Sequence, residues 1–154
     1  MVNKAFVIFV NLLIFSCPIQ TEYSHSFISF EELPTQAKAF VRAYFGHYAI
    51  RFIKREMSMT RTDYTVQFEN GMEIGFNSNG DWDEVESTDE CLPSEFLNNM
   101  VISYLNKNHS DYCLHEISKG RHKFELELTD GPKLVFNKKG EFLRYEHKAI
   151  HNNT

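Results

Sequence analysis

The sequence lacks the short motifs that mark the common enzyme classes. It contains no G-x-S-x-G, H-E-x-x-H, phosphate-loop or dinucleotide-binding pattern, and its three cysteines have no C-x-x-C spacing. Catalysis needs a nucleophile with a base, or paired carboxylates in a pocket, and no such arrangement is evident from these residues. The sequence therefore argues against an enzyme, and we expect no cofactor.

An excess of positive charge is also missing. The formal net charge is -5 at pH 7, which argues against a nucleic-acid partner because such proteins cluster Lys and Arg. The hydrophobic share of 42% and the aromatic share of 14% suit a packed interior and exclude a disordered chain. A chain of 154 residues is long enough for one domain, or for two very small units that share a core.

Long apolar runs are absent except at the N-terminus. Lys4 precedes the apolar run Ala5 to Phe15, which suits the central region of a signal peptide over residues 1–17. The run is too short for a spanning helix, which needs about 20 apolar residues. We therefore expect an exported protein with no transmembrane helix in its mature part.

Cysteine is scarce, and its positions leave two questions open. Cys17 follows Ile14-Phe15-Ser16, an order that resembles a bacterial lipobox, so Cys17 is a candidate for lipidation. Phe15 and Pro18 fit that motif imperfectly, and the alternative is an ordinary signal peptide. Cys91 and Cys113 either form a disulfide in an oxidising compartment or remain two half-buried thiols.

The segment Tyr64 to Glu86 reads as a three-stranded meander. Asn70-Gly71 and Asn79-Gly80 separate runs in which apolar and polar residues alternate, and Asn-Gly predicts type I′ turns with positive φ at both residues. Alternation places the apolar side chains on one face of the strands. That face needs a cover, and an amphipathic helix is expected just upstream, from Leu33-Pro34 to Phe45.

The pattern returns after 60 residues. The apolar strand positions and the turn glycines of the first half recur in the second half at this spacing. Val41, Tyr44 and Glu56 likewise correspond to Val101, Tyr104 and Glu116. A second helix is expected over Pro93 to Asn106. We predict an α+β fold of two tandem α-β4 repeats, each an antiparallel four-stranded meander covered on one face by a helix. The repeats occupy residues 33–91 and 92–147, after a tether over 18–32 and before a polar tail over 148–154.

These motifs resemble a known family. An LPxxA/F helix start, followed by FxNG-xxIxFxxxGxW in one half and LxDG-xxLxFxxxGxF in the other, is similar to the PepSY-like proteins and to the fold of the beta-lactamase inhibitor protein. The resemblance covers about Leu33 to Glu146. It implies a protein in the periplasm of a Gram-negative bacterium, or tethered there as a lipoprotein, that presents a helix-free sheet face to a partner. No residue matches a defined inhibitory loop.

The polar face of the predicted sheet is the candidate binding surface, and we expect a non-enzymatic module that engages an envelope protein or peptide there. Its residues are Thr65, Gln67, Glu69, Glu73, Lys123, Glu125, Glu127, Lys133 and Val135. The alternative is a small-molecule or ion sensor that uses an acidic junction between the repeats, formed by Asp81, Asp83, Glu84 and Glu86, although a solvated linker explains these charges as well. His115 and His122 flank one turn, but nothing clearly completes a metal site, and none is expected.

Overall fold

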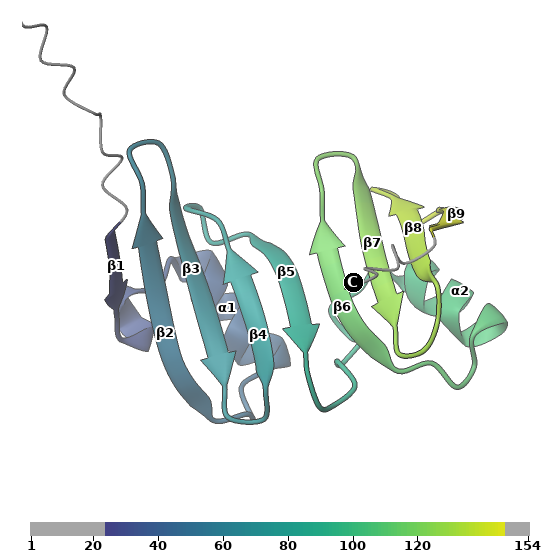
Figure 1. The fold of residues 1–154 in the computed structure, drawn as a ribbon, viewed down its shortest axis with the longest axis horizontal. Helices are drawn as coiled ribbons and strands as arrows, with labels where there is room; N and C mark the ends of the chain where they lie inside the picture. Colours follow the sequence, from purple (N-terminus) through teal and green to yellow (C-terminus); the bar gives the residue numbers. More distant parts are fainter. Residues whose placement is uncertain (1–23, 147–154) are drawn as a thin grey trace, which may run out of the picture.

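The computed structural model describes residues 24–146, which form an α+β fold with one nine-stranded antiparallel sheet in the order β1-β2-β3-β4-β5-β6-β7-β8-β9 (Figure 1). The predicted signal peptide, Cys17 and the tail over 148–154 lie outside these residues. No helix in the described part of the chain is long and apolar enough to cross a membrane. The elements are β1 (Ser24–Phe27), η1 (Phe30–Glu32), α1 (Thr35–Tyr44), β2 (Ile50–Met57), β3 (Thr62–Phe68), β4 (Met72–Phe76), β5 (Trp82–Ser87), α2 (Asn99–Asn108), β6 (Leu114–Lys119), β7 (Lys123–Leu128), β8 (Lys133–Asn137) and β9 (Phe142–Glu146).

Both helices cover the same face of the sheet, and one core fills the space between. Along β4, Met72, Ile74 and Phe76 are buried while the residues between them are not, as alternation in a half-buried strand requires. Ala37 and Val41 of α1 and Val101 and Leu105 of α2 belong to the same core cluster as these strand residues. Within residues 24–146, no helix lies on the opposite face of the sheet (Figure 1).

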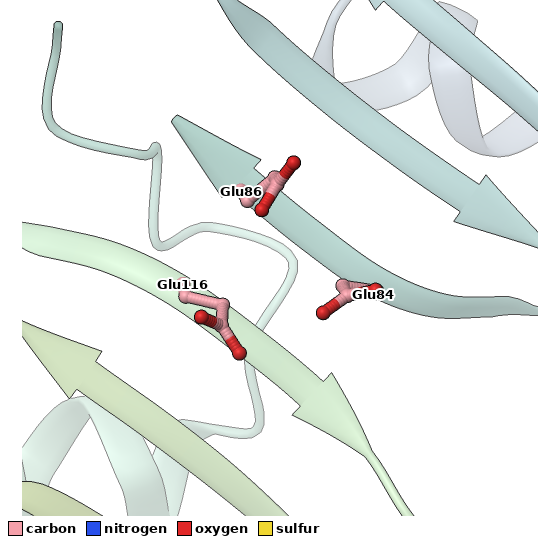
Figure 2. A group of neighbouring side chains, drawn as sticks. All are labelled: Glu84, Glu86 and Glu116. Carbon is pink, nitrogen blue, oxygen red and sulfur yellow. The ribbon is translucent and has the colours of Figure 1, made fainter. Parts of the chain in front are cut away.

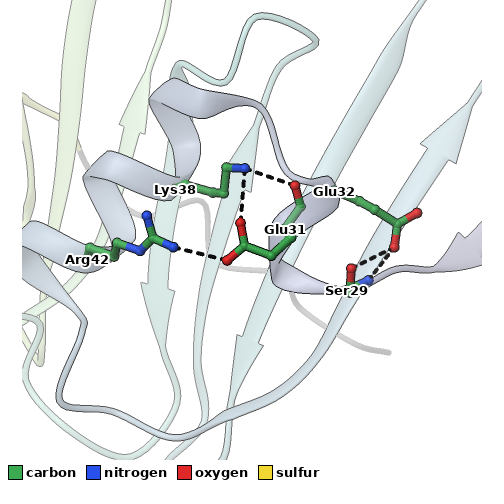
Figure 3. Close-up of polar contacts among 5 residues, drawn as sticks. All are labelled: Ser29, Glu31, Glu32, Lys38 and Arg42. Carbon is green, nitrogen blue, oxygen red and sulfur yellow. Dashed lines mark hydrogen bonds and ion pairs between the residues drawn. The ribbon is translucent and has the colours of Figure 1, made fainter.

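The segment before α1 is ordered, so the predicted tether over 18–32 is wrong for residues 24–32. β1 pairs antiparallel with β2, and η1 follows it. Glu31 pairs with Lys38 at 3.4 Å and with Arg42 at 3.1 Å on α1, while Ser29 donates to the Glu32 carboxylate at 2.8 Å (Figure 3). Edge pairing uses backbone groups, so the sequence carried no periodic signal for β1.

The two Asn-Gly turns of the meander exist, but they are not type I′. Gly71 and Gly80 have φ of 83° and 84°. Asn70 and Asn79 do not have the positive φ that a type I′ turn also requires, because Asp130 is the one non-glycine residue with positive φ among residues 24–146. In the second turn, Gly80 N–H donates to Asn77 O at 2.9 Å, and Asn77 N–H donates to Asp81 O at 2.9 Å. This is a three-residue loop with a left-handed glycine, the other common hairpin connection.

The second helix begins later than predicted, because Asn98 caps it. The Asn98 side chain accepts from Met100 N–H at 2.8 Å and donates to Lys139 O at 3.1 Å, which fixes the start of α2 at Asn99. The preceding residues, predicted as the first turns of the helix, instead place Phe96 against Phe40, Phe45 and Trp82 with ring centroids 5.5 to 5.7 Å apart.

The register also corrects one detail of the 60-residue pattern. That shift aligned Glu56 with Glu116, but the sheet places Glu56 opposite Asp63 and Glu116 opposite Glu127. Gln67, which the shift aligns with Glu127, lies opposite Phe52. The hairpin between β2 and β3 is longer than that between β6 and β7, so a constant shift cannot hold on both strands of the pair.

A short ladder, which we call the seam, joins β5 to β6. It contains three residue pairs, Glu84 with Ser118, Val85 with Ile117 and Glu86 with Glu116. The chain between these strands includes α2, and its ends are joined by a disulfide between Cys91 and Cys113, whose Cα atoms are 5.0 Å apart. Of the two alternatives open from the sequence, the structure therefore shows the bridge. It closes a loop beside the seam.

Replacing both cysteines, as C91S/C113S, should lower the free energy of unfolding by about 3 kcal/mol, the chain-entropy value for a loop of this size. Urea denaturation in oxidising buffer measures the loss. In reducing buffer the two proteins should have equal stability. Equal stability in oxidising buffer would show that the bridge contributes nothing.

Candidate binding groove

The helix-free face of the sheet is concave and holds a groove of about 420 Å³. Its walls come from β2 to β7, so residues from both sides of the seam meet there. The lining is dominated by acidic side chains: Glu56, Asp63, Glu73, Asp83, Glu84, Glu86 and Glu125, with Arg61 and Lys119 as the basic residues. The groove is therefore an acidic depression that crosses the seam.

Four glutamates form a continuous row across this face, which we call the carboxylate row. Glu73 of β4 lies opposite Glu86 of β5, Glu86 opposite Glu116 of β6, and Glu116 opposite Glu127 of β7. Neighbouring strands are about 4.8 Å apart, so each carboxylate has a like charge as its direct neighbour, which destabilises a sheet. Lys133 of β8 ends the row beyond Glu127.

Basic side chains neutralise only one end of the row. Lys133 pairs with Glu127 at 2.8 Å and with Glu125 at 3.4 Å, and Lys123 also pairs with Glu125. Across residues 24–146, no ion pair involves Glu73, Glu84, Glu86 or Glu116. The centre of the groove, around the seam, therefore has an excess of negative charge.

The environment of these carboxyl groups shifts their protonation. Burial against the sheet raises the pKa of Glu116, and the neighbouring Glu127 raises it further while Lys133 opposes the change. Burial and the charge of Glu86 likewise raise the pKa of Glu73. For Glu84, burial and then Glu116 raise the pKa. The ionised forms of Glu73, Glu84 and Glu116 are thus disfavoured in the folded protein.

Basic neighbours oppose the rise in pKa at Asp83 and reverse it at Glu125. Burial and Asp63 raise the pKa of Asp83, although Arg61 lowers it. The hydrogen bond from Lys123 lowers the pKa of Glu125 instead. The paired end of the groove therefore remains ionised more readily than the unpaired centre.

Three of the unpaired carboxylates converge. Glu84 and Glu86 of β5 and Glu116 of β6 each offer an oxygen within 4.8 Å of the others, and their side chains face one another across the seam (Figure 2). The first two are exposed and the third is half-buried. Oxygen ligands at this separation are the kind that Ca²⁺ takes, and carboxylates can bind it in bidentate fashion.

Only some of the residues predicted for the binding surface line the groove. Thr65, Glu73 and Glu125 line the groove, while Gln67, Glu127 and Lys133 lie on the same face in register with the carboxylate row. Glu69 lies beyond the end of β3, exposed in the turn to β4, and does not line the groove. Val135 pairs with Glu125 on this face but is buried.

The predicted acidic junction divides in the same way. Asp83, Glu84 and Glu86 line the groove. Asp81 instead accepts a hydrogen bond of 2.6 Å from Gln36 on α1, which holds it on the helix side of the sheet. Sequence reasoning missed Glu116 as a candidate, because its approach to Glu86 depends on a strand pairing between residues 30 positions apart.

Glu116→Gln should raise the free energy of unfolding at pH 7 by about 0.5–1 kcal/mol, the range for relieving a like-charge cross-strand pair. A raised folded-state pKa means that the ionised group costs stability above that pKa. The gain should therefore shrink as the pH falls from 7 toward the ordinary glutamate pKa of 4.5. Urea titrations at several pH values measure it, with Glu69→Gln as the matched control outside the groove. A gain that stays constant with pH would contradict this account.

Comparison with solved structures finds the same fold in periplasmic proteins. One is described as a "putative calcium-regulated periplasmic protein" from Bacteroides thetaiotaomicron, with a TM-score of 0.75 at 22% identity over 80% of this chain and 97% of the other. Another is a "putative periplasmic protein from DUF2874 family" from Bacteroides vulgatus, with a TM-score of 0.73 at 23% identity over 80% and 97%. A third, a periplasmic protein of unknown function from Bacteroides vulgatus, has a TM-score of 0.71 at 26% identity over 81% and 99%.

None of the curated proteins that were compared matches the chain. A family model does: the one described as "Putative beta-lactamase-inhibitor-like, PepSY-like" matches residues 62–144, from β3 through most of β9. The match spans more than half of the sequence and includes every residue of the carboxylate row. The chain therefore belongs to the PepSY-like, beta-lactamase-inhibitor-like family.

Proposed function

We propose that the chain is an exported, non-enzymatic binding module whose open sheet face engages a protein or peptide segment that carries Lys and Arg. The carboxylate row supports this most directly, because Glu73, Glu86 and Glu116 lie side by side without a basic partner. A ligand with positive charge would relieve their mutual repulsion. The unbound protein therefore has a charge imbalance that such a partner corrects.

The shape of the surface also suits a binding role. The helices and the apolar core occupy one face of the sheet, which leaves the other face as a rigid backbone platform. The groove is broad enough, at about 420 Å³, for several side chains of a peptide. Strand pairing fixes the backbone positions of these glutamates, so no backbone ordering is needed when a ligand binds, which favours affinity.

Export is supported by two observations. The disulfide between Cys91 and Cys113 is the kind of bond that persists in an oxidising compartment. The three solved structures of this fold are all described as periplasmic. A signal peptide over residues 1–17 and lipidation of Cys17 remain proposals from the sequence, as does the origin of the fold from two α-β4 repeats over 33–91 and 92–147.

A short synthetic peptide with Lys at alternate positions tests the proposal. Glu73→Gln combined with Glu86→Gln should weaken its binding by about tenfold at low salt, given ~0.7 kcal/mol for each lost charge contact. Fluorescence anisotropy measures the dissociation constant. Glu69→Gln, with the same chemical change in the β3–β4 turn, should bind as the wild type does. A Glu-containing peptide that bound equally well, or a loss in the control, would overturn the surface assignment.

The second candidate is a Ca²⁺ sensor at Glu84, Glu86 and Glu116. Their converging oxygens favour it, and one protein of the same fold is described as calcium-regulated. Three carboxylates can supply up to six oxygens, which reaches the lower end of the coordination number of Ca²⁺. The affinity expected for an extracellular site of this kind is a dissociation constant of about 10⁻⁴ to 10⁻³ M.

Calorimetry and thermal unfolding with Ca²⁺ distinguish the two functions. At ten times its dissociation constant, Ca²⁺ should stabilise the protein by about 1.4 kcal/mol. Replacing the three glutamates with Gln should abolish that gain, and Mg²⁺ should give less because it prefers a compact octahedral site. No heat and no stabilisation at millimolar Ca²⁺ would exclude the sensor and leave peptide binding as the function of the groove.

A further inference from the structure

We propose that the seam between β5 and β6 is a hinge whose opening depends on charge. Repulsion between carboxylates on the open face weakens the pairing of the two strands, and neutralisation of those carboxylates strengthens it. The disulfide and the Phe96 cluster, which we define as Phe96 with Phe40, Phe45 and Trp82, keep the strands together. This goes beyond the proposed function, because it concerns the free protein and holds whatever ligand the groove takes. As a consequence, binding of a cation, a basic segment or protons would change the hydrogen-exchange protection of the backbone amides in the β5–β6 ladder.

By its register, the seam is the shortest ladder among the nine described strands. It has three residue pairs, whereas the ladders on either side, β4 with β5 and β6 with β7, have five each. The strands of the seam are also far apart along the chain, so no tight turn joins them directly. A ladder this short has few hydrogen bonds with which to resist an opposing force.

The opposing force comes from the open face. Glu86 lies directly opposite Glu116, and Glu84 has an oxygen within 4.8 Å of both. This separation is well inside the screening length of about 8 Å at physiological salt, so the charges interact strongly. The acidic groups that face them are Glu73 from β4, Asp83 from β5, and Glu125 and Glu127 from β7.

The basic groups around the seam are engaged elsewhere. Lys54 of β2 pairs with Glu56 at 3.3 Å, and Lys133 of β8 pairs with Glu127 at 2.8 Å. Lys119, at the end of β6, lies over the Trp82 ring at 4.7 Å from its centroid. Arg61 contacts Asp63 at 2.5 Å, and His115 of β6 lowers the pKa of Glu116 only as the smallest contribution. The repulsion at the seam is therefore reduced but not cancelled.

Two contacts keep β5 and β6 together: a disulfide at one end of the seam and an aromatic cluster on the helix side of the sheet. Cys91 follows the end of β5 and Cys113 directly precedes β6, so the disulfide joins the ends at which the chain leaves one strand and enters the next (Figure 1). Next to it, Leu92 N–H donates to Leu114 O at 2.8 Å. On the helix side, the Phe96 cluster crosses the seam: Phe96 packs against Trp82 of β5 with ring centroids 5.5 Å apart, and Trp82 stacks on Phe124 of β7 with ring centroids 6.3 Å apart. The end near Glu84 and Ser118 has no covalent restraint, so that end is where the seam opens.

Hydrogen exchange measured residue by residue tests the hinge on the full chain without any ligand. In the double variant Glu86→Gln and Glu116→Gln, protection of the amides of residues 84–86 and 116–118 should rise by about tenfold, the equivalent of one pKa unit of interaction between carboxylates. Amides in the β2–β3 ladder should rise less, by no more than the gain in global unfolding free energy that urea titration gives for the same variant. Glu69→Gln should match the wild type throughout.

Acidification provides the second arm. After correction for the intrinsic exchange rate, lowering the pH from 7 to 5 should increase protection of the same amides in the wild type and increase it less in the double variant, which keeps Glu84 at the seam. Unaltered protection at the seam in the variant would overturn the proposal. So would an equal rise across the whole sheet, because that reports general stability and not a hinge. Peptide binding can fail with this result intact, since the measurement contains no peptide.

Discussion

Strand alternation at the β5–β6 ladder is the constraint on which the rest of the structure depends. Val85 and Ile117 face each other across it and are fully buried against the helices. With those two side chains inward, the residues on either side of them must point to the opposite face. Burial of one apolar pair therefore forces Glu84, Glu86 and Glu116 together on the open side. The hydrophobic core and the acidic groove are two consequences of one register.

This coupling explains how the fold tolerates an unfavourable row of charges. Each buried aliphatic side chain contributes roughly 1.5–3 kcal/mol, more than a like-charge cross-strand pair removes. The core on the helix side, which includes Val85 and Ile117 of the seam, outweighs the repulsion on the other side. A surface that is unfavourable when empty and favourable when neutralised is what a binding platform for cations requires, so the cost in stability and the proposed function have the same origin.

The sequence predicted those features that depend on local patterns. Alternation along Met72, Ile74 and Phe76 predicted β4 and its buried face, and the turn glycines located the hairpins. It could not predict β1, a four-residue edge strand without an apolar alternation, or the later start of α2, which Asn98 sets by hydrogen bonds to Met100 in the helix and to Lys139 in the β8–β9 turn. Glu116 was missed for the same reason. Its approach to Glu86 depends on a pairing between distant strands, and no local pattern encodes it.

The most direct test of the central claim is a carbon-13 NMR titration of the glutamate side chains in the wild-type protein. Burial on the open face and the like charges that the register forces together should each raise the pKa of Glu73, Glu84 and Glu116 above the ordinary value of 4.5, and the like charges should show as coupled steps in the curves of the neighbours. The pKa of Glu125, which is hydrogen-bonded to Lys123, should lie below that value. Single-step titrations at or below 4.5 for the three unpaired glutamates would contradict the account.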